Sequence, residues 1–140
     1  MRYLAIDYGL KRLGLAQCDP GETIVSPLCQ LPVDVSRPEE TFEKLQEVIV
    51  EYGIDAVVVG LPLNMDDSEG EQAKLSRQFA ERLAQAVAIP VDLQDERLSS
   101  MAADEKLAEI GLSESKRKNK RDMLAACDIL QEYLHKKVNE

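Results

Sequence analysis

Two short runs of the sequence, residues 3–6 and 56–60, are apolar at nearly every position. A strand with one face in water alternates apolar and polar residues, whereas a strand covered on both faces does not. Both runs therefore predict buried strands of a parallel or mixed sheet, which needs helices on both of its faces. This requirement restricts the chain to an α/β architecture.

Three further segments have strand character and complete a mixed five-stranded sheet. They cover residues 13–18, 23–31 and 91–96, so the first three strands of the chain follow one another as a β-meander. The later strands are separated by helical segments, which favours parallel pairing through crossovers. We expect one domain over residues 1–140, with no repeat or linker.

Helix starts are indicated by capping residues ahead of apolar residues at helical spacing. Two capping boxes are predicted, a third helix ends at Gly111, and the basic segment before the last helix is interpreted as a linker. The predicted caps are Ser36 with Glu39, Ser68 with Glu71, Ser99 or Ser100, and Asn119, whose helix runs to about Val138.

Composition excludes several classes of function. A formal net charge of −9 argues against a uniformly basic nucleic-acid-binding surface. His135 is the single histidine, so histidine-based metal sites and triads are excluded, and three cysteines without CxxC spacing predict reduced thiols. We find no apolar run of membrane-spanning length and no signal peptide, and expect a cytoplasmic protein that does not bind membranes.

One segment is strongly basic although the chain as a whole is negatively charged. Residues 116–121, KRKNKR, contain five positive charges, which predict a basic finger that contacts phosphates. Asn64, in the loop after residues 56–60, is interpreted equally as a substrate contact or as a turn cap. The predicted phosphate-binding residues are Lys11, Arg12, Arg97, Lys116, Arg117, Lys118, Lys120 and Arg121.

Aromatic residues make up 4% of the chain, and tryptophan is absent. A stacking platform for single-stranded bases is therefore poorly supplied. We expect the protein to recognise the backbone and shape of nucleic acid.

Asp7 ends the first buried strand with a carboxylate. Burying an unpaired carboxylate is costly, so Asp7 must lie near water, a hydrogen-bond donor or a cation. Gly9 fits a tight turn into the next strand, so Asp7 can also be interpreted as the cap of a hairpin turn.

Glu96 ends the strand over residues 91–96, beside Asp95 and Arg97. Because the carboxyl ends of parallel strands gather at one edge of a sheet, Asp7 and Glu96 are predicted to share that edge. The alternative is a charged loop in which Arg97 pairs with one of the two acids.

Asp122 begins an apolar stripe in the last helix, and Ala125 and Ala126 would let that helix approach the sheet closely. Asp128, six residues later, is predicted to be solvated. Asp122 has a second interpretation as a capping acid, since its spacing from Asn119 is that of a capping box.

The three acids, Asp7, Glu96 and Asp122, come from separate elements and converge on one predicted cluster. Clustered carboxylates repel one another unless a hard cation holds them, and oxygen ligands favour Mg²⁺ or Mn²⁺. The expected chemistry is two-metal phosphoryl transfer.

Four motifs, IDYGLKRLGLA, VVVGLPLNMDDSEG, DERLSS and DMLAACDILQEYL, together resemble the YqgF/RuvX family over residues 4–134. Members of that family are described as Holliday junction resolvases and as pre-16S rRNA nucleases. The resemblance implies an RNase H-like fold and divalent-metal-dependent phosphodiester hydrolysis, with the motif acids on Asp7, Glu96 and Asp122. Two positions depart from the pattern: Asp67 replaces a glycine, and Arg121 replaces an apolar residue.

The resemblance implies processing of the 5′ end of the 16S rRNA precursor, whereas the sequence itself does not choose between RNA and branched DNA. Junction cleavage would normally require a homodimer, and no dimer face is identified. A non-catalytic nucleic-acid or transcription-associated module is a further alternative, disfavoured by the three acids. A sugar-kinase or actin-like ATPase lobe would need a second lobe, for which 140 residues leave no room.

Overall fold

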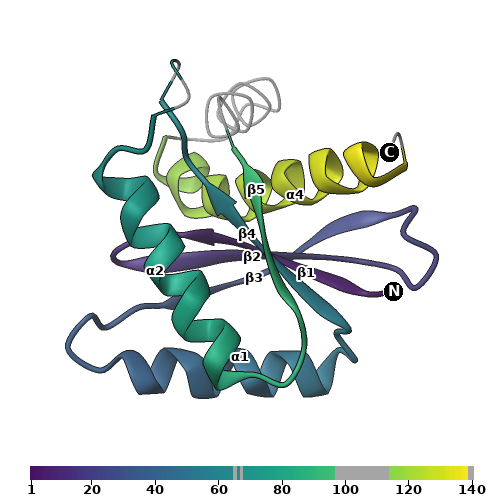
Figure 1. Ribbon diagram of the computed structural model, residues 1–140, viewed down its shortest axis with the longest axis horizontal. Coiled ribbons are helices and arrows are strands. Elements are labelled where there is room, and N and C mark those ends of the chain that lie inside the picture. Colours follow the sequence, from purple (N-terminus) through teal and green to yellow (C-terminus); the bar gives the residue numbers. More distant parts are fainter. Residues whose placement is uncertain (65, 67, 97–113, 139–140) are drawn as a thin grey trace.

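The computed structural model describes residues 1–64, 66, 68–96 and 114–138, with side chains in the last helix from residue 123. Five strands form one mixed sheet in the order β3-β2-β1-β4-β5 (Figure 1). Antiparallel pairing joins β1 to β2 and β2 to β3, and parallel pairing joins β1 to β4 and β4 to β5. The strands are β1 (Tyr3–Tyr8), β2 (Arg12–Cys18), β3 (Val25–Pro32), β4 (Ala56–Leu61) and β5 (Val91–Asp95).

Helices cover both faces of this sheet, as the two apolar runs predict. The helices α1 (Pro38–Glu51) and α2 (Glu71–Ala86) lie on one face, and α4 (Glu114–Val138) crosses the other (Figure 1). Each face has its own core: Ile6 and Val59 belong to the one beneath α1 and α2, and Ala5 and Val58 to the one beneath α4. The expected α/β architecture with a β-meander and parallel strands is confirmed.

The predicted capping boxes are wrong. Helix α1 begins at Pro38 after Arg37, α2 begins at Glu71 after Gly70, and neither helix start has a side-chain cap. Ser36 and Ser68 instead hydrogen-bond Asp34 and Asp66, so each serine is held within the preceding turn. A serine two residues after an aspartate can hydrogen-bond that carboxylate as readily as it can cap a helix.

The end of α1 agrees with the prediction that Gly53 stops it. Gly53 has φ of 63°, and the N–H groups of Gly53 and Ile54 donate to the carbonyls of Val50 and Ile49. This is a Schellman motif, which favours glycine because other residues are strained at positive φ.

The last helix begins earlier than the sequence predicts. Helix α4 starts at Glu114, so residues 116–121 lie in its first turns, and Asn119 lies inside the helix instead of capping it. Lysine and arginine are good helix formers, which explains why the basic segment continues the helix. The predicted third helix, from Ser99 or Ser100 to Gly111, lies outside the described residues.

Asp128 is buried, with 8% of its surface exposed, so the prediction that it is solvated is wrong. Helix α4 packs across all five strands, and the buried face is therefore wider than a single stripe. None of the helices in the described part of the chain combines the length and apolar character that crossing a membrane requires.

Candidate active site

Asp7 lies near the carboxyl end of β1, on the face covered by α4. Successive side chains of a strand alternate between faces, and Ala5, two residues before Asp7, belongs to the core beneath α4. Asp7 pairs across the sheet with Gly14 of β2. The neighbouring residue Tyr8 faces the opposite side and packs with the core beneath α1 and α2.

Glu96 directly follows β5 and reaches the same edge of the sheet. Its backbone N–H donates to the carbonyl of Leu61 at 3.1 Å, which continues the parallel pairing of β4 and β5 by one step. The carboxyl group of Glu96 contacts that of Asp7 through a hydrogen bond. The predicted convergence of these two acids at the strand ends is therefore confirmed by the structure.

Gly60 provides the space for the Glu96 carboxyl group. A Cβ at this position would lie 2.6 Å from Oε2 of Glu96 and 2.5 Å from Cδ1 of Ile129 in α4. Sequence reasoning treats Gly60 only as the end of a strand. Its signal is a glycine directly after three valines in a buried strand, which often marks close approach of another group.

Burial raises the pKa of Glu96 to about 9, and the negative charge of Asp7 and the hydrogen bond to Asp7 add to the effect. The protonated Glu96 donates to the Asp7 carboxylate, so the pair shares one proton. Oε2 of Glu96 is buried and has no hydrogen-bond partner among the described atoms. A buried carboxylate oxygen without a donor, beside a second carboxylate, fits a hard cation.

Asp122 lies in α4 two helical turns before Ile129, the residue whose side chain lies beside Gly60. Ala125 and Ala126 are fully buried against the sheet, which confirms the predicted close approach of this helix. The side chain of Asp122 lies outside the described residues. Within the described part, no group of three acidic, histidine or cysteine side chains could hold a metal, so the three-acid cluster remains a prediction.

Glu132 is a further acid close to this pair, and the sequence analysis did not identify it. Burial raises the pKa of Glu132 on α4, and the charges of Asp128 and Asp95 add to the effect. Glu132 in turn helps to raise the pKa of Glu96. The i, i+4 spacing of Asp128 and Glu132 on one helix is the only signal in the sequence. These acids make the potential at this edge more negative and so favour cations.

The structure describes the side chains of only two of the predicted basic residues, Lys11 and Arg12. Lys11 is exposed in the turn after β1, and Arg12 begins β2 and is half-buried. Arg97 lies outside the described residues. The five basic residues between 116 and 121 belong to the first turns of α4, but their side chains are likewise outside the description.

Asn64 has a structural role in the loop after β4. Its side-chain amide donates to Oγ of Ser68 at 3.0 Å, and its backbone N–H donates to the Ser68 carbonyl at 2.9 Å. A bridge between Leu63 and Glu69 closes the same loop. These contacts favour the turn-holding interpretation, and a substrate contact by Asn64 remains a prediction.

The sequence matches a known protein family over nearly its whole length. A family model described as "RuvX: Holliday junction resolvase" matches residues 1–136. The chain belongs to the RuvX family. A relative from Geobacillus thermodenitrificans, with the name "Putative pre-16S rRNA nuclease", is 42% identical over 137 residues, which are 98% of this chain and 99% of the relative. The motifs that resemble this family in the sequence therefore identify it correctly.

Solved structures show that this RuvX chain has a RuvC-like, RNase H-like fold. Thermus thermophilus RuvC in complex with a Holliday junction substrate has a TM-score of 0.60 and 18% identity, covering 99% of this chain and 96% of RuvC. A fowlpox virus resolvase in complex with Holliday junction DNA has a TM-score of 0.58 and 12% identity, covering 99% of both chains. At these identities the likeness establishes the fold of the RuvX chain alone.

Proposed function

We propose that this RuvX chain is a divalent-metal-dependent nuclease that hydrolyses phosphodiester bonds in the precursor of 16S rRNA. The observation that carries the proposal is the contact between Asp7 and Glu96, held in a space that Gly60 leaves open. Apposed, buried carboxyl groups cost stability, and a cost of this kind is typical of functional sites. The buried oxygen of Glu96 that lacks a donor supplies a ligand position for a cation.

Asp7 and Glu96 would hold Mg²⁺ or Mn²⁺ together with Asp122. When bound, the cation activates a water molecule and stabilises charge on the phosphodiester. Glu96 must release the proton that it shares with Asp7 before both carboxylates can act as ligands. Lys11 and the basic start of α4 would bind phosphates on either side of the scissile bond.

The substrate proposal rests on the names of the relatives. The relative that is 42% identical over nearly its full length is named for pre-16S rRNA, whereas the proteins solved with Holliday junctions are less than 20% identical. A Holliday junction remains the second candidate because the family model is described by that activity. Symmetric cuts in a junction would require two active sites, and hence a homodimer.

A side-by-side cleavage assay tests this proposal. The purified protein is incubated with Mg²⁺ or Mn²⁺ and either an RNA bearing the precursor end of 16S rRNA or a four-way DNA junction. We expect cleavage of the RNA at one end, and loss of cleavage in Asp7→Asn, Glu96→Gln and Asp122→Asn. Glu47→Gln removes an exposed acid from α1, on the opposite face of the sheet, and should leave cleavage unchanged.

The possible results separate the alternatives. Cleavage of the junction alone by a species that sediments as a dimer would replace the RNA proposal with junction resolution. Binding of both nucleic acids without metal-dependent cleavage of either would indicate a non-catalytic module. Near wild-type turnover in any of the three acid variants would show that this acid is structural.

A further inference from the structure

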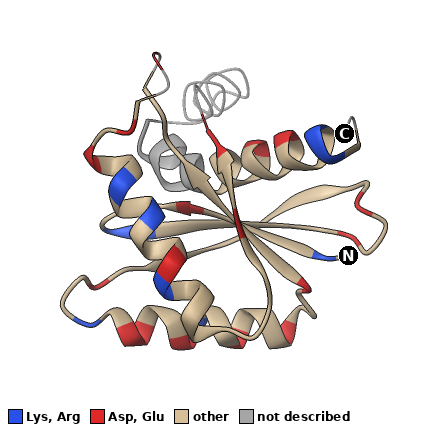
Figure 2. Ribbon diagram, in the orientation of Figure 1, with Lys and Arg blue, Asp and Glu red and all other residues tan. Residues whose placement is uncertain are grey.

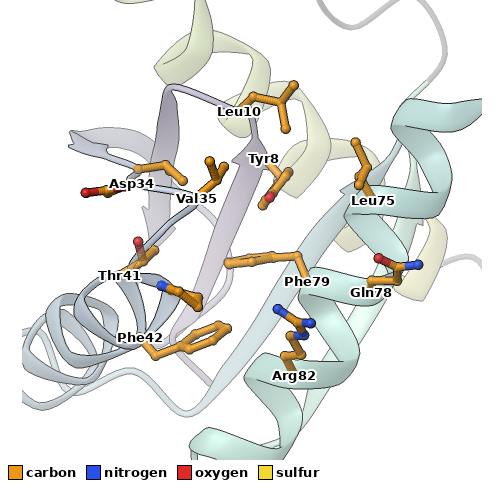
Figure 3. Close-up of a pocket in the computed structure, with 12 residues that line it drawn as sticks. Tyr8, Leu10, Asp34, Val35, Thr41, Phe42, Leu75, Gln78, Phe79 and Arg82 are labelled. Carbon is orange, nitrogen blue, oxygen red and sulfur yellow. The ribbon is translucent and has the colours of Figure 1, made fainter.

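A cavity of about 200 Å³ lies between α1, α2 and the end of β1. It is on the face of the sheet opposite to Asp7, and we call it the base pocket. Figure 3 shows Phe79 lying across its centre, with Tyr8 and Phe42 on either side and Arg82 directing its guanidinium toward Phe79. Leu10 and Val35, which are 51% and 67% exposed, also line it.

The base pocket concentrates the aromatic side chains of this protein. The chain contains two phenylalanines and four tyrosines, and both phenylalanines and Tyr8 line this one cavity. The ring centroids of Tyr8 and Phe79 are 4.5 Å apart, and those of Phe42 and Phe79 are 5.7 Å apart. Phe79 is buried, with 7% of its surface exposed, so the half-buried rings of Tyr8 and Phe42 supply the surface on which a base can stack.

The size and lining of the cavity suit one planar ring. A cavity of about 150 Å³ holds a benzene molecule, whereas drug-sized ligands occupy about 300 Å³ or more. Arg82 and Gln78 are exposed on α2 and line the cavity with polar groups, and Arg82 forms no ion pair with any described residue. A nucleobase combines a face that stacks on aromatic rings with an edge that such groups can bind.

The base pocket is connected to the candidate active site through β1. Asp7 and Tyr8 are consecutive, so one faces the acids and the other faces the cavity. The turn after Tyr8 contains Leu10 at the cavity and the exposed Lys11, whose carbonyl accepts from the N–H of Val33, another lining residue. A strand that crosses this turn can place a phosphate near Asp7 and a nearby base in the cavity.

We propose that the base pocket binds one unstacked base of the substrate strand, within a few nucleotides of the scissile phosphate. This inference rests on the proposed nuclease function. The charge distribution indicates the direction of approach: α2 contains Lys74, Arg77 and Arg82, whereas α1 is dominated by glutamates (Figure 2). The strand therefore enters over the β1–β2 turn and α2 and avoids α1.

The test uses an RNA stem with a single-stranded extension, in which an abasic residue replaces one nucleotide at a time. Binding is measured by fluorescence anisotropy with the full chain bearing Glu96→Gln, which prevents cleavage. We expect one position, or two adjacent positions, at which the abasic residue weakens binding about tenfold, the effect of losing one stacked base. Other positions of the extension should show little change.

Variants of α2 assign this effect to the base pocket. In the Glu96→Gln background, Arg82→Ala and Gln78→Ala should weaken binding of the intact RNA and reduce the effect of the abasic position. Lys74→Ala and Gln85→Ala are the controls, since they remove one positive charge and one amide from exposed sites on α2 outside the cavity. They should retain the full abasic effect.

The outcomes distinguish this inference from the proposed nuclease function. A flat abasic profile, or a profile that Arg82→Ala and Gln78→Ala leave unchanged, would overturn the base pocket and favour an aromatic side chain of a protein partner as its occupant. A position-dependent profile lost in these two variants supports the base pocket even if the wild type does not cleave RNA. Cleavage by the wild type with a flat profile refutes the base pocket alone.

Discussion

Gly60 and Glu96, at the carboxyl ends of the neighbouring strands β4 and β5, share a space that can hold only one side chain. A Cβ on Gly60 would lie 2.6 Å from Oε2 of Glu96, closer than real Cβ atoms approach a carboxylate oxygen. The carboxyl group of Glu96 therefore reaches Asp7 only because position 60 lacks a side chain. The glycine is part of the site although it contributes no functional group.

Gly60→Ala should abolish cleavage even though alanine is compatible with a buried strand. The added methyl group must displace either the Glu96 carboxyl group or Ile129, and overpacking of this kind costs about 1–3 kcal/mol of unfolding free energy. Cleavage rates and thermal unfolding measure the two effects. Gly70→Ala is the control, because its Cβ would meet nothing closer than 3.6 Å. Normal cleavage by Gly60→Ala would show that the position of Glu96 is not critical.

The metal-free protein should lose stability as the pH rises from about 5 to about 9. Burial, with the charge of Asp7, raises the pKa of Glu96 to about 9, far above its ordinary value of 4.5. The folded state therefore retains a proton that the unfolded state has released, and its advantage declines across this window. The slope for one proton is at most about 1.4 kcal/mol per pH unit.

Glu96→Gln isolates this contribution because the amide does not titrate. In thermal melts with chelator at several pH values, the melting temperature of the variant should rise relative to that of the wild type as the pH increases. Parallel curves for the two proteins between pH 5 and 9 would contradict a protonated Glu96.

The meeting of Asp7 and Glu96 could be predicted because it depends on strand direction alone. Two acids that follow buried parallel strands lie at one edge whatever the details of packing. The burial of Asp128 could not be predicted, because it depends on how α4 crosses the sheet. The prediction that Ser36 and Ser68 cap α1 and α2 was wrong for a local reason. Each serine hydrogen-bonds an aspartate two residues earlier, and this partner competes with the helix end.

The base pocket could not be predicted from the sequence either. Tyr8, Phe42 and Phe79 are far apart along the chain, and their apolar spacing indicates only the buried faces of β1, α1 and α2. The composition gives the number of aromatic residues but not their positions in the folded protein. Only the packing of two helices against one strand end brings the three rings together.

Reversing Lys116, Arg117 and Lys118 to glutamate should weaken nucleic-acid binding and flatten its salt dependence. Each phosphate contact that is lost reduces the slope of log K against log salt by about 0.7 to 0.9. Helix α4 should persist, because acidic residues near a helix N-terminus are favourable. Affinities across a salt titration measure the slope.

A pair of single changes on α4 controls for net charge. Lys118→Glu and Lys136→Glu alter the charge equally near opposite ends of the helix. We expect only Lys118→Glu to reduce the salt slope. Equal slopes for both variants and the wild type would show that residues 116–118 do not contact phosphates.

Above about pH 9, where Glu96 is ionised, Asp7→Asn should raise the melting temperature of the metal-free protein, and it should remove most of the response to Mg²⁺. Asp7 is one of the charges that oppose ionisation of Glu96, so its neutralisation relieves repulsion in the folded state once Glu96 has lost its proton. About 1 kcal/mol of relief corresponds to roughly 4 °C in a domain of this size. Bound Mg²⁺ stabilises the wild type by about 2.7 kcal/mol at 100 times its dissociation constant, and should stabilise Asp7→Asn clearly less.

Asp19→Asn supplies the comparison, because Asp19 is an aspartate that caps a turn. Hydrogen bonds from the Ile24 N–H, the Thr23 hydroxyl and the Thr23 N–H lower the pKa of Asp19 to about 2. Neutralising it should lower the melting temperature and leave the Mg²⁺ response intact. If Asp7→Asn behaved in the same way as Asp19→Asn in melts with chelator and with Mg²⁺, Asp7 would be a turn cap and the metal site would lose its first ligand.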